Sequence, residues 1–444
     1  MTDTADVHAL LREELFEAWG LLSTEERLEG FSILPRSEAE ELFLSLPTID
    51  QAELLTALPA ADRRSWVRLL PPDDAADVLQ NVEDAEREGL LALLDPAALT
   101  EVTALLAYKE DVAGGLMNPR YARLRPEMSI DEAIKYLRRL TRQTIENIYY
   151  AYVIDTEHTL RGVVSFRELL LAPPESRVRD MMRTELITVP DTMDQERVSE
   201  LFAQHDLLAL PVVDENGRMK GIVTADDIVD VVKEEATEDI QKLGAVEALE
   251  APYMQTTLLE LMRKRAPWLV LLFCGQMLTI SVMEHYEGKL GAILFLNIFI
   301  PIILSSGGNS GSQAATLVVR SLALGEMRLA EWWKVVRREV LIGLLLGLSL
   351  GVLGFGRVLF GGSRGAFGDH FVVLGLAVAA SIVGVVAWGT IVGSMLPFVL
   401  RRLKFDPASA STPFVATLCD VTGLILYFNV ATTILAASGA TGRT

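Results

Sequence analysis

The sequence has few residues of the kinds that bind soft metals or cross-link a chain. Its 444 residues include two cysteines and five histidines. Both cysteines, Cys274 and Cys419, lie in apolar stretches, so no disulfide framework is expected. Zinc and copper sites need clustered cysteine or histidine, and neither residue is clustered here. The composition therefore argues against a soft-metal site.

The N-terminus lacks the pattern of a secretory signal. It reads MTDTADVHALLREEL, which is acidic and amphipathic, so we expect it to stay in the cytoplasm. Residues 1–263 contain 52 Asp and Glu against 26 Lys and Arg, a net charge of −26. Such a surface repels nucleic acid and anionic lipid and attracts cations, although any single carboxylate of this kind more often belongs to a solubilising surface. No nucleic-acid partner is expected.

Charged residues are scarce after residue 265. Residues 264–444 contain 14 basic and 8 acidic residues, which leave five nearly uncharged stretches at 266–283, 290–319, 340–356, 371–400 and 408–442. An α-helix crosses the hydrocarbon with about 20 apolar residues, so five transmembrane helices are expected. Pro301 and the pair Gly307-Gly308 predict a break in the second helix.

The basic residues predict how these helices are oriented. Connections rich in Lys and Arg stay in the cytoplasm. Such residues precede the first stretch and separate the second from the third and the fourth from the fifth; they are Lys264, Arg265, Arg320, Arg328, Lys334, Arg337, Arg338, Arg401, Arg402 and Lys404. The chain is therefore predicted to be a multi-pass plasma-membrane protein, with its N-terminus in the cytoplasm and its C-terminus outside.

Asp420 is the only charged residue between Ala408 and Gly442. At 1.5 Å per helical residue it lies roughly 18 Å into the fifth helix, near the middle of the bilayer. Carboxylates at such depth are costly and usually mark an ion pathway. No basic residue of a neighbouring helix is expected at that depth, which favours a cation site. A protonated, hydrogen-bonded structural Asp is the alternative.

A polar motif, SSGGNSGSQAAT, interrupts the second apolar stretch. Asn309 and Gln313 stand one helical turn apart and face the same side. Gly307 and Gly311 allow close approach of another helix. Two interpretations stay open: helix packing assisted by polar side chains, or a pore in which Asn309, Gln313 and Thr316 contact the water shell of a cation.

The available ligands narrow the choice of ion. Mg²⁺ gives up water reluctantly and keeps most of its hydration shell, which suits a pore with few carboxylates and several neutral oxygen groups. A Ca²⁺ cage needs more direct oxygen ligands. Zn²⁺ or Cu⁺ would need His or Cys. The membrane part is therefore predicted to conduct hydrated Mg²⁺.

A Leu-Pro pair recurs every twelve residues near the N-terminus. The pairs begin at Leu34, Leu46, Leu58 and Leu70. Proline is favoured at the start of a helix, so the repeat predicts short helices stacked into an α-superhelix. Asp73 and Asp77 follow the last pair and stand one turn apart. They fit either a cation site or a solvated acidic helix start.

From Met117 onward strands alternate with helices in two similar units. The first unit contains AYVID and LRGVVS, and the second contains LPVVD and MKGIVTADD. These elements resemble a tandem pair of CBS domains. Many CBS pairs bind adenine nucleotides, so the resemblance implies ATP binding through Thr224 and Asp227, with Asp227 on the ribose. The first unit has Glu168 after Ser165 in place of this Asp.

The chain as a whole resembles the MgtE family of magnesium channels. The resemblance rests on the acidic helical start, on the CBS pair and on the motifs EDVAGGLM, ATEDI, GGNSGSQAAT and ATLCDVTG. It implies a multi-domain fold: an α-superhelical N-terminal domain (1–116), tandem α/β CBS domains (117–236), a connecting plug helix (237–263) and a five-helix α transmembrane domain (264–444).

The resemblance also implies a homodimer with a pore on its two-fold axis. Asp420 of both subunits is implied to bind hydrated Mg²⁺, with Asn309 and the Ala416 carbonyl as neighbours. Cytoplasmic Mg²⁺ is implied to bridge the acidic domain, the CBS domains and the connecting helix and so to hold the pore shut. The residues at the matching positions are Asp73, Asp77, Asp214, Asp226, Glu247 and Glu250.

The sequence thus predicts a Mg²⁺ channel or transporter, and not an enzyme, that imports Mg²⁺ and is closed by Mg²⁺ on its acidic cytoplasmic domains. Two alternatives stay open. One is a proton-coupled carrier of another divalent metal, such as Mn²⁺ or Co²⁺, in which Asp420 titrates. The other is a membrane-anchored nucleotide sensor whose membrane part is structural. The expected partners are the lipid membrane, Mg²⁺ and a second copy of the chain.

Overall fold

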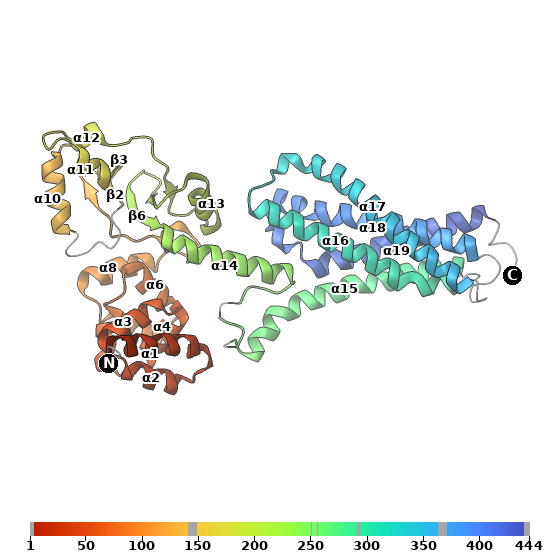
Figure 1. The fold of residues 1–444 in the computed structure, drawn as a ribbon, viewed down its shortest axis with the longest axis horizontal. Helices are drawn as coiled ribbons and strands as arrows, with labels where there is room; N and C mark the ends of the chain where they lie inside the picture. Colours follow the sequence, from red (N-terminus) through yellow and green to blue (C-terminus); the bar gives the residue numbers. More distant parts are fainter. Residues whose placement is uncertain are drawn as a thin grey trace. The chain divides into compact units, whose positions relative to one another are not determined.

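The computed structural model describes residues 4–140, 149–249, 251–254, 256–290, 294–362 and 371–438. The chain forms two compact units, Met1–Glu234 and Glu235–Thr444 (Figure 1). The described part of the first unit combines short helices with two small sheets, and that of the second unit consists of helices and their connections.

Short helices fill the start of the first unit. They are α1 (Thr4–Ala18), α2 (Thr24–Ile33), α3 (Arg36–Ser45), α4 (Thr48–Ala57), α5 (Ala60–Val67), α6 (Pro72–Gln80), α7 (Asp84–Leu91), α8 (Pro96–Leu105) and α9 (Ala113–Leu116), with η1 (Trp19–Leu21) after α1. A proline directly precedes each of α3 to α6, where its missing N–H costs no helical hydrogen bond. The leucine before each of these prolines is buried. The predicted repeat of stacked short helices is confirmed.

Two three-stranded sheets of the same topology follow. The first contains β1 (Arg123–Leu124), β2 (Tyr150–Ile154) and β3 (Leu160–Ser165), and the second contains β4 (Val189–Pro190), β5 (Ala209–Val213) and β6 (Met219–Thr224). In each sheet the first strand is parallel to the second, and the third is antiparallel to it. The accompanying helices are α10 (Ile130–Leu140), α11 (Phe166–Leu171), α12 (Val178–Met181) and α13 (Gln195–His205). The duplication confirms the predicted tandem α/β domains.

The predicted separate connecting helix is divided between two longer helices. α14 (Ala225–Leu243) begins in the second α/β domain and runs through the predicted boundary at residue 236. Residues 251–254 are not helical, and α15 (Leu258–Leu290) then continues into the first apolar stretch. No Gly or Pro lies between Leu258 and Ala266 to end the helix there. The exact domain boundaries stay a prediction.

Five long helices form most of the second unit. After α15 come α16 (Ile300–Ala323), α17 (Trp332–Gly362), α18 (Phe371–Arg402) and α19 (Thr412–Ala437), with η2 (Leu294–Phe299), η3 (Leu329–Glu331) and η4 (Pro407–Ser409) before α16, α17 and α19. Within the described residues, four segments are long and apolar enough to cross a membrane: Leu258–Tyr286, Leu329–Gly361, Phe371–Arg402 and Thr412–Ala437. These four helices fit a multi-pass membrane protein. α16 is not among them, because it carries the polar motif.

The break expected in the second membrane helix is absent, since α16 is continuous from Ile300 to Ala323. Pro301 lies in its first turn, where proline is tolerated. Gly307 and Gly308 are buried within the helix, so packing of their backbone offsets their low helix propensity. A Cβ on Gly393 of α18 would collide with the carbonyl oxygen of Gly311. The predicted close helix approach at Gly311 is therefore confirmed.

Candidate cation sites

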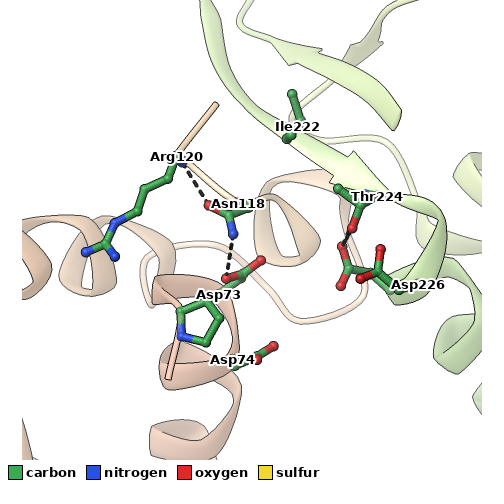
Figure 2. A pocket seen from close by; sticks show the side chains of 9 residues that line it. Asp73, Asp74, Asn118, Arg120, Ile222, Thr224 and Asp226 are labelled. Carbon is green, nitrogen blue, oxygen red and sulfur yellow. Dashed lines mark hydrogen bonds between the residues drawn. The ribbon is translucent and has the colours of Figure 1, made fainter. Parts of the chain in front are cut away.

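An acidic cavity lies in the first unit, between the start of α6 and the second α/β domain. It has a volume of about 90 Å³ and opens to solvent. Four aspartates line it, Asp73, Asp74, Asp226 and Asp227, together with side chains that include Asn118, Arg120 and Thr224 (Figure 2). The structure thus brings together four of the predicted site residues, Asp73, Thr224, Asp226 and Asp227. We call this cavity the acidic pocket.

The sequence of α6 explains one side of the acidic pocket. Pro71 precedes the helix and Pro72 opens it, so Asp73 and Asp74 fall in the first turn. Unpaired backbone N–H groups and the helix dipole favour carboxylates there. Asp73 is only 7% exposed, however, and burial of a carboxylate costs solvation. Its ionised form therefore needs a donor or a cation nearby.

Asp227 is held on the other side by the end of β6. The backbone N–H and the Oγ1 hydroxyl of Thr224 donate to Asp227 Oδ2 at 3.1 and 2.6 Å. Burial nevertheless raises the pKa of Asp227 to about 6, against these hydrogen bonds. Thr224 and Asp227, the predicted nucleotide ligands, therefore bind each other and face the acidic pocket.

The first α/β domain has the same contact between a hydroxyl residue at the end of a strand and an acid three residues later, but here the pKa of the acid is lowered. The N–H of Ser165 donates to Glu168 at 2.9 Å, and Arg183 pairs with the same carboxylate at 2.6 Å. Despite partial burial, these hydrogen bonds and the arginine hold the pKa of Glu168 below its usual value. Asp227 differs because it is more deeply buried than Glu168 and because like charges, including Asp226, lie nearby.

Asn118 connects the two sides of the acidic pocket. Its backbone N–H donates to the Ile222 carbonyl of β6 at 2.7 Å, and the Ile222 N–H donates back at 3.0 Å. Its side-chain Nδ2 donates to Asp73 Oδ1 at 3.1 Å, while its Oδ1 accepts from the Arg120 N–H at 2.8 Å (Figure 2). The Arg120 guanidinium is paired with Glu101, at 2.9 Å from Nε to Oε2.

Burial and mutual repulsion raise the pKa values of the acids on α6. Burial is the larger cause for Asp73, whose pKa lies well above its usual value, with Asp74 and Asp227 adding to it. Asp77 stands one turn further along α6. Burial raises its pKa to about 8, and repulsion from Asp74 and Glu110 adds to the shift. A positive charge in or beside the acidic pocket would stabilise the ionised forms of Asp73 and Asp77 against burial and repulsion.

The donor set fits a hydrated hard cation. Among the described residues, no three Asp, Glu, His or Cys side chains converge closely enough to form a complete metal cage. Mg²⁺ does not require such a cage, because it keeps several waters and is usually held by one or two carboxylates. Carboxylates on facing elements around an open cavity match this behaviour, and the lining offers neither thiolate nor imidazole.

Asp214 lies in the turn between β5 and β6, outside the acidic pocket. Its Oδ1 accepts hydrogen bonds from the N–H groups of Arg218 and Asn216, each at 2.9 Å. These bonds, the one from Arg218 first, hold the pKa of Asp214 below its usual value. The carboxylate thus serves the hairpin, and its predicted role as a Mg²⁺ ligand stays a prediction.

The remaining predicted acids belong to the second unit. The Glu247 carboxylate lies 3.6 Å from Lys264 Nζ, and its N–H donates to the Lys264 carbonyl at 3.2 Å. These contacts tie the connection after α14 to α15. Glu250 lies outside the described residues, so the predicted role of this residue has no structural description.

The C-terminal end of α14 contacts the connection between α18 and α19. Lys242 Nζ donates to Asp406 Oδ2 at 2.7 Å and also pairs with Glu238, one turn earlier on α14. Leu243 packs against the buried cluster of Val319, Ala408 and Ala410. Charged and apolar contacts therefore fix the end of α14 directly before the helix that carries Asp420.

Asp420 is the ninth of the 26 residues of α19 and is partly buried. Because the helix begins at Thr412, Asp420 lies roughly 12 Å from its start and not the predicted 18 Å. A Cβ placed on Gly308 of α16 would stand 3.8 Å from Asp420 Oδ1 and 3.5 Å from the Cα of Ala416. Gln276 of α15 hydrogen-bonds the carboxylate through its side chain. Asp420 forms no ion pair within the described residues. Asp420, Ala416 and Gly308 of the polar motif are therefore neighbours, and the role of Asn309 and the Ala416 carbonyl at an ion stays a prediction.

The polar side chains of α16 lie on one exposed face. Asn309, Gln313 and Thr316 are all exposed in the single chain. Asn309 Nδ2 is 3.3 Å from Ser305 Oγ, and Thr316 Oγ1 donates to the Ser312 carbonyl at 3.0 Å. Amides and hydroxyls exposed among membrane-crossing helices require water or protein around them.

Three residues at these sites escaped the sequence analysis: Asn118, Lys242 and Gln276. Asn118 directly precedes Pro119, which indicates only an extended segment. Lys242 lies in a helix with i, i+4 acids, the usual sign of a solvated face. Gln276 was an isolated amide in an apolar stretch, and such an amide within a membrane helix was the one available signal.

Family models match most of the chain. The model described as the MgtE intracellular N domain matches residues 11–111, and CBS domain models match residues 111–175 and 178–234. The MgtE model, described as a divalent cation transporter, matches residues 300–430. Together with four segments long and apolar enough to cross a membrane, these matches define a divalent cation transporter with an N-terminal helical domain and CBS domains.

Two individual relatives show to which family of divalent cation transporters the chain belongs. The magnesium transporter MgtE of Thermus thermophilus is 44% identical over 368 residues, which cover 82% of this chain and 80% of that protein. The magnesium transporter MgtE of Bacillus subtilis is 33% identical over 369 residues, which cover 81% and 78%. The chain belongs to the MgtE family. These two relatives are named as transporters, which is consistent with a protein that is not an enzyme.

Among solved structures, the cytosolic domain of the Mg²⁺ channel MgtE in complex with ATP is 42% identical to this chain. The match covers 52% of this chain and 95% of that structure, with a TM-score of 0.48.

Proposed function

We propose that this protein imports Mg²⁺ across the plasma membrane and that Asp420 binds the ion on its path. The placement of Asp420 carries the proposal, since it is the one charged residue of α19 and lies beside Gly308 and Ala416. The MgtE relatives named above are magnesium transporters, which supports Mg²⁺ as the cargo. The Ala416 carbonyl and the Asn309 amide are the proposed neighbours of the hydrated ion.

Two copies of the chain would complete the pore. The exposed face of α16 with Asn309, Gln313 and Thr316 is costly against lipid. A two-fold axis beside this face would cover it and would place a second Asp420 opposite the first. Gln313 and Thr316 would then line the water-filled path. The basic connections support a cytoplasmic N-terminus and an external C-terminus.

Mg²⁺ on the cytoplasmic side is proposed to close the pore by binding in the acidic pocket. The carboxylates of Asp73, Asp77, Asp226 and Asp227 repel one another in the absence of a cation. A divalent ion stabilises the arrangement that brings them together, and it shifts the equilibrium only as far as it prefers that arrangement. Asp214, Glu247 and Glu250 remain proposed ligands at further contacts.

α14 is the proposed route from the acidic pocket to the pore. Asp226 and Asp227 lie in its first turn, and Lys242 in its last turn contacts Asp406. Asp406 caps η4, directly before α19. A change at the first turn of one continuous helix therefore reaches the start of the helix that bears Asp420.

ATP at the CBS pair is a second proposed ligand. Its predicted contact, Asp227, also faces the acidic pocket, so nucleotide and Mg²⁺ would act on the same carboxylate. Measurement of ATP affinity in the presence and absence of Mg²⁺ tests this link, since linked ligands must alter each other's affinity equally.

The pore assignment is tested by Mg²⁺ uptake into liposomes that contain the full chain. Asp420→Asn keeps the shape of the side chain but removes its charge, and uptake is expected to fall to the level of empty liposomes. Glu326→Gln removes an exposed acid from the connection after α16 and should leave uptake unchanged. Wild-type uptake by Asp420→Asn would contradict the assignment. Uptake that follows an imposed pH gradient would favour the proton-coupled carrier.

A further inference from the structure

The side-chain amide of Asn118 has a fixed direction in the acidic pocket. Its Oδ1 accepts from the Arg120 N–H at 2.8 Å, so its NH₂ group faces Asp73, where Nδ2 donates to Oδ1 at 3.1 Å (Figure 2). A reversed amide would place its oxygen against a carboxylate and its NH₂ against an N–H donor. Asn118 therefore acts on Asp73 as a donor.

The backbone of Asn118 is anchored to the opposite wall. Its N–H and carbonyl both pair with Ile222 in β6. Gly221 makes this contact possible, because a Cβ at that position would lie 2.8 Å from the Asn118 carbonyl oxygen. Thr224, which holds Asp227, is two residues along the same strand. Asn118 thus links Asp73 of α6 to β6, the strand that also positions Asp227.

Arg120, the neighbouring basic residue, does not neutralise Asp73. The Arg120 guanidinium pairs with Glu101 through Nε at 2.9 Å and Nη2 at 2.8 Å. Figure 2 shows it directed away from Asp73. Among the described residues that line the acidic pocket, the donor supplied to Asp73 by a side chain is thus a neutral amide, which orients the carboxylate without cancelling its charge.

We propose that Asn118 is a positioning residue for a divalent cation in the acidic pocket: it holds one oxygen of Asp73 and leaves the other for an ion shared with Asp227. This inference rests on the proposed regulation by Mg²⁺. An arginine or lysine in place of Asn118 would neutralise the site, and an apolar residue would leave Asp73 free to turn away. The neutral donor keeps the carboxylate both charged and correctly placed.

The test is a Mg²⁺ titration of the full chain in lipid nanodiscs, followed by resistance to limited proteolysis. Asn118→Ala should raise the Mg²⁺ concentration at half-protection by about tenfold, the effect of losing one hydrogen bond to a charged group. Gln204→Ala removes an exposed amide from α13 of the same α/β domain and should leave the midpoint unchanged. Melting in EDTA shows whether each variant folds. If Asn118→Ala does not fold, Asn118→Ser, whose hydroxyl is too short to reach Asp73, should show the same shift.

A double-mutant cycle separates positioning from general stabilisation. Asp73→Asn should also raise the midpoint, and adding Asn118→Ala to it should produce little further change, because the amide acts through the Asp73 carboxylate. Additive shifts, or an unchanged midpoint in Asn118→Ala, would overturn the inference. An unchanged midpoint in Asp73→Asn itself would instead contradict the proposed Mg²⁺ site.

Discussion

At the residue scale, this chain places carboxylates in three different environments. Glu168 is balanced by Arg183, and Asp214 is bound by the N–H groups of its own turn. Asp73 and Asp227 in the acidic pocket, and Asp77 one turn along α6, are buried and lie near other carboxylates, so their pKa values rise. The sequence identified Asp73 and Asp77 as a cluster but could not separate them from Asp214, because only the fold decides which acids meet a donor.

The raised pKa values predict a pH dependence of stability without Mg²⁺. The folded-state values of about 6 for Asp227 and about 8 for Asp77 exceed the unfolded value of about 4. The stability contributed by these groups is therefore fully present below about pH 4 and is lost as pH rises through 6 and then 8. Melting of the full chain in EDTA should occur at progressively lower temperature from pH 5.5 to 8.5.

Two variants test the origin of this effect. Asp77→Asn should flatten the fall between about pH 7 and 8.5, by up to about 1.4 kcal/mol per pH unit. Asp214→Asn should not flatten it, because the pKa of Asp214 is lowered and its contribution is lost only in acid. Saturating Mg²⁺ should reduce the slope in the wild type. A flat profile in EDTA would refute the assigned environment of Asp77.

At the element scale, local signals predicted what local chemistry decides. The Leu-Pro repeat gave the correct helix starts of α3 to α6, since proline acts on its own backbone. The expected break in α16 was wrong, because Gly307 and Gly308 are packed against neighbouring helices. The run from Leu258 into the membrane segment was also missed as one helix. Tertiary packing and helix continuity depend on residues outside any single motif, so the motif alone could not predict them.

The contact of Lys242 with Asp406 should couple α14 to the pore. Lys242→Met keeps the apolar stem and removes the ammonium, so closure by cytoplasmic Mg²⁺ should weaken. A partly exposed ion pair contributes about 1 kcal/mol, which corresponds to about fivefold in the Mg²⁺ concentration for half-closure of flux. Lys233→Met removes another ion-paired lysine of α14, that of Asp230, and should have no such effect. Equal behaviour of the two variants would contradict the coupling.

The close contact of α16 with α18 should tolerate no added side chain. Gly393→Ala would press a methyl group against the Gly311 carbonyl, and overpacking of this kind costs about 1–3 kcal/mol. Gly356→Ala adds the same methyl group to α17, where no atom lies within 4 Å of the added Cβ. The detergent-solubilised Gly393→Ala protein should therefore melt at lower temperature than Gly356→Ala, and equal melting would contradict the contact.

At the scale of the whole molecule, charge is distributed by function. The first 263 residues carry a net charge of −26, whereas the membrane part has few acids and one carboxylate within α19. Many exposed acids suit reversible, weak binding of a divalent ion, and one partly buried carboxylate suits an ion in transit. α14 belongs to both compact units and joins the two tasks in one continuous helix.

The most direct test of this account is Mg²⁺ flux through the reconstituted full chain as Mg²⁺ is raised on the side of the acidic domains. The wild type should close as this concentration rises. Asp73→Asn should conduct as well as the wild type at low Mg²⁺ and should stay open at concentrations that close the wild type. Wild-type flux that does not depend on cytoplasmic-side Mg²⁺, or normal closure of Asp73→Asn, would contradict the claim that the acidic pocket senses the transported ion.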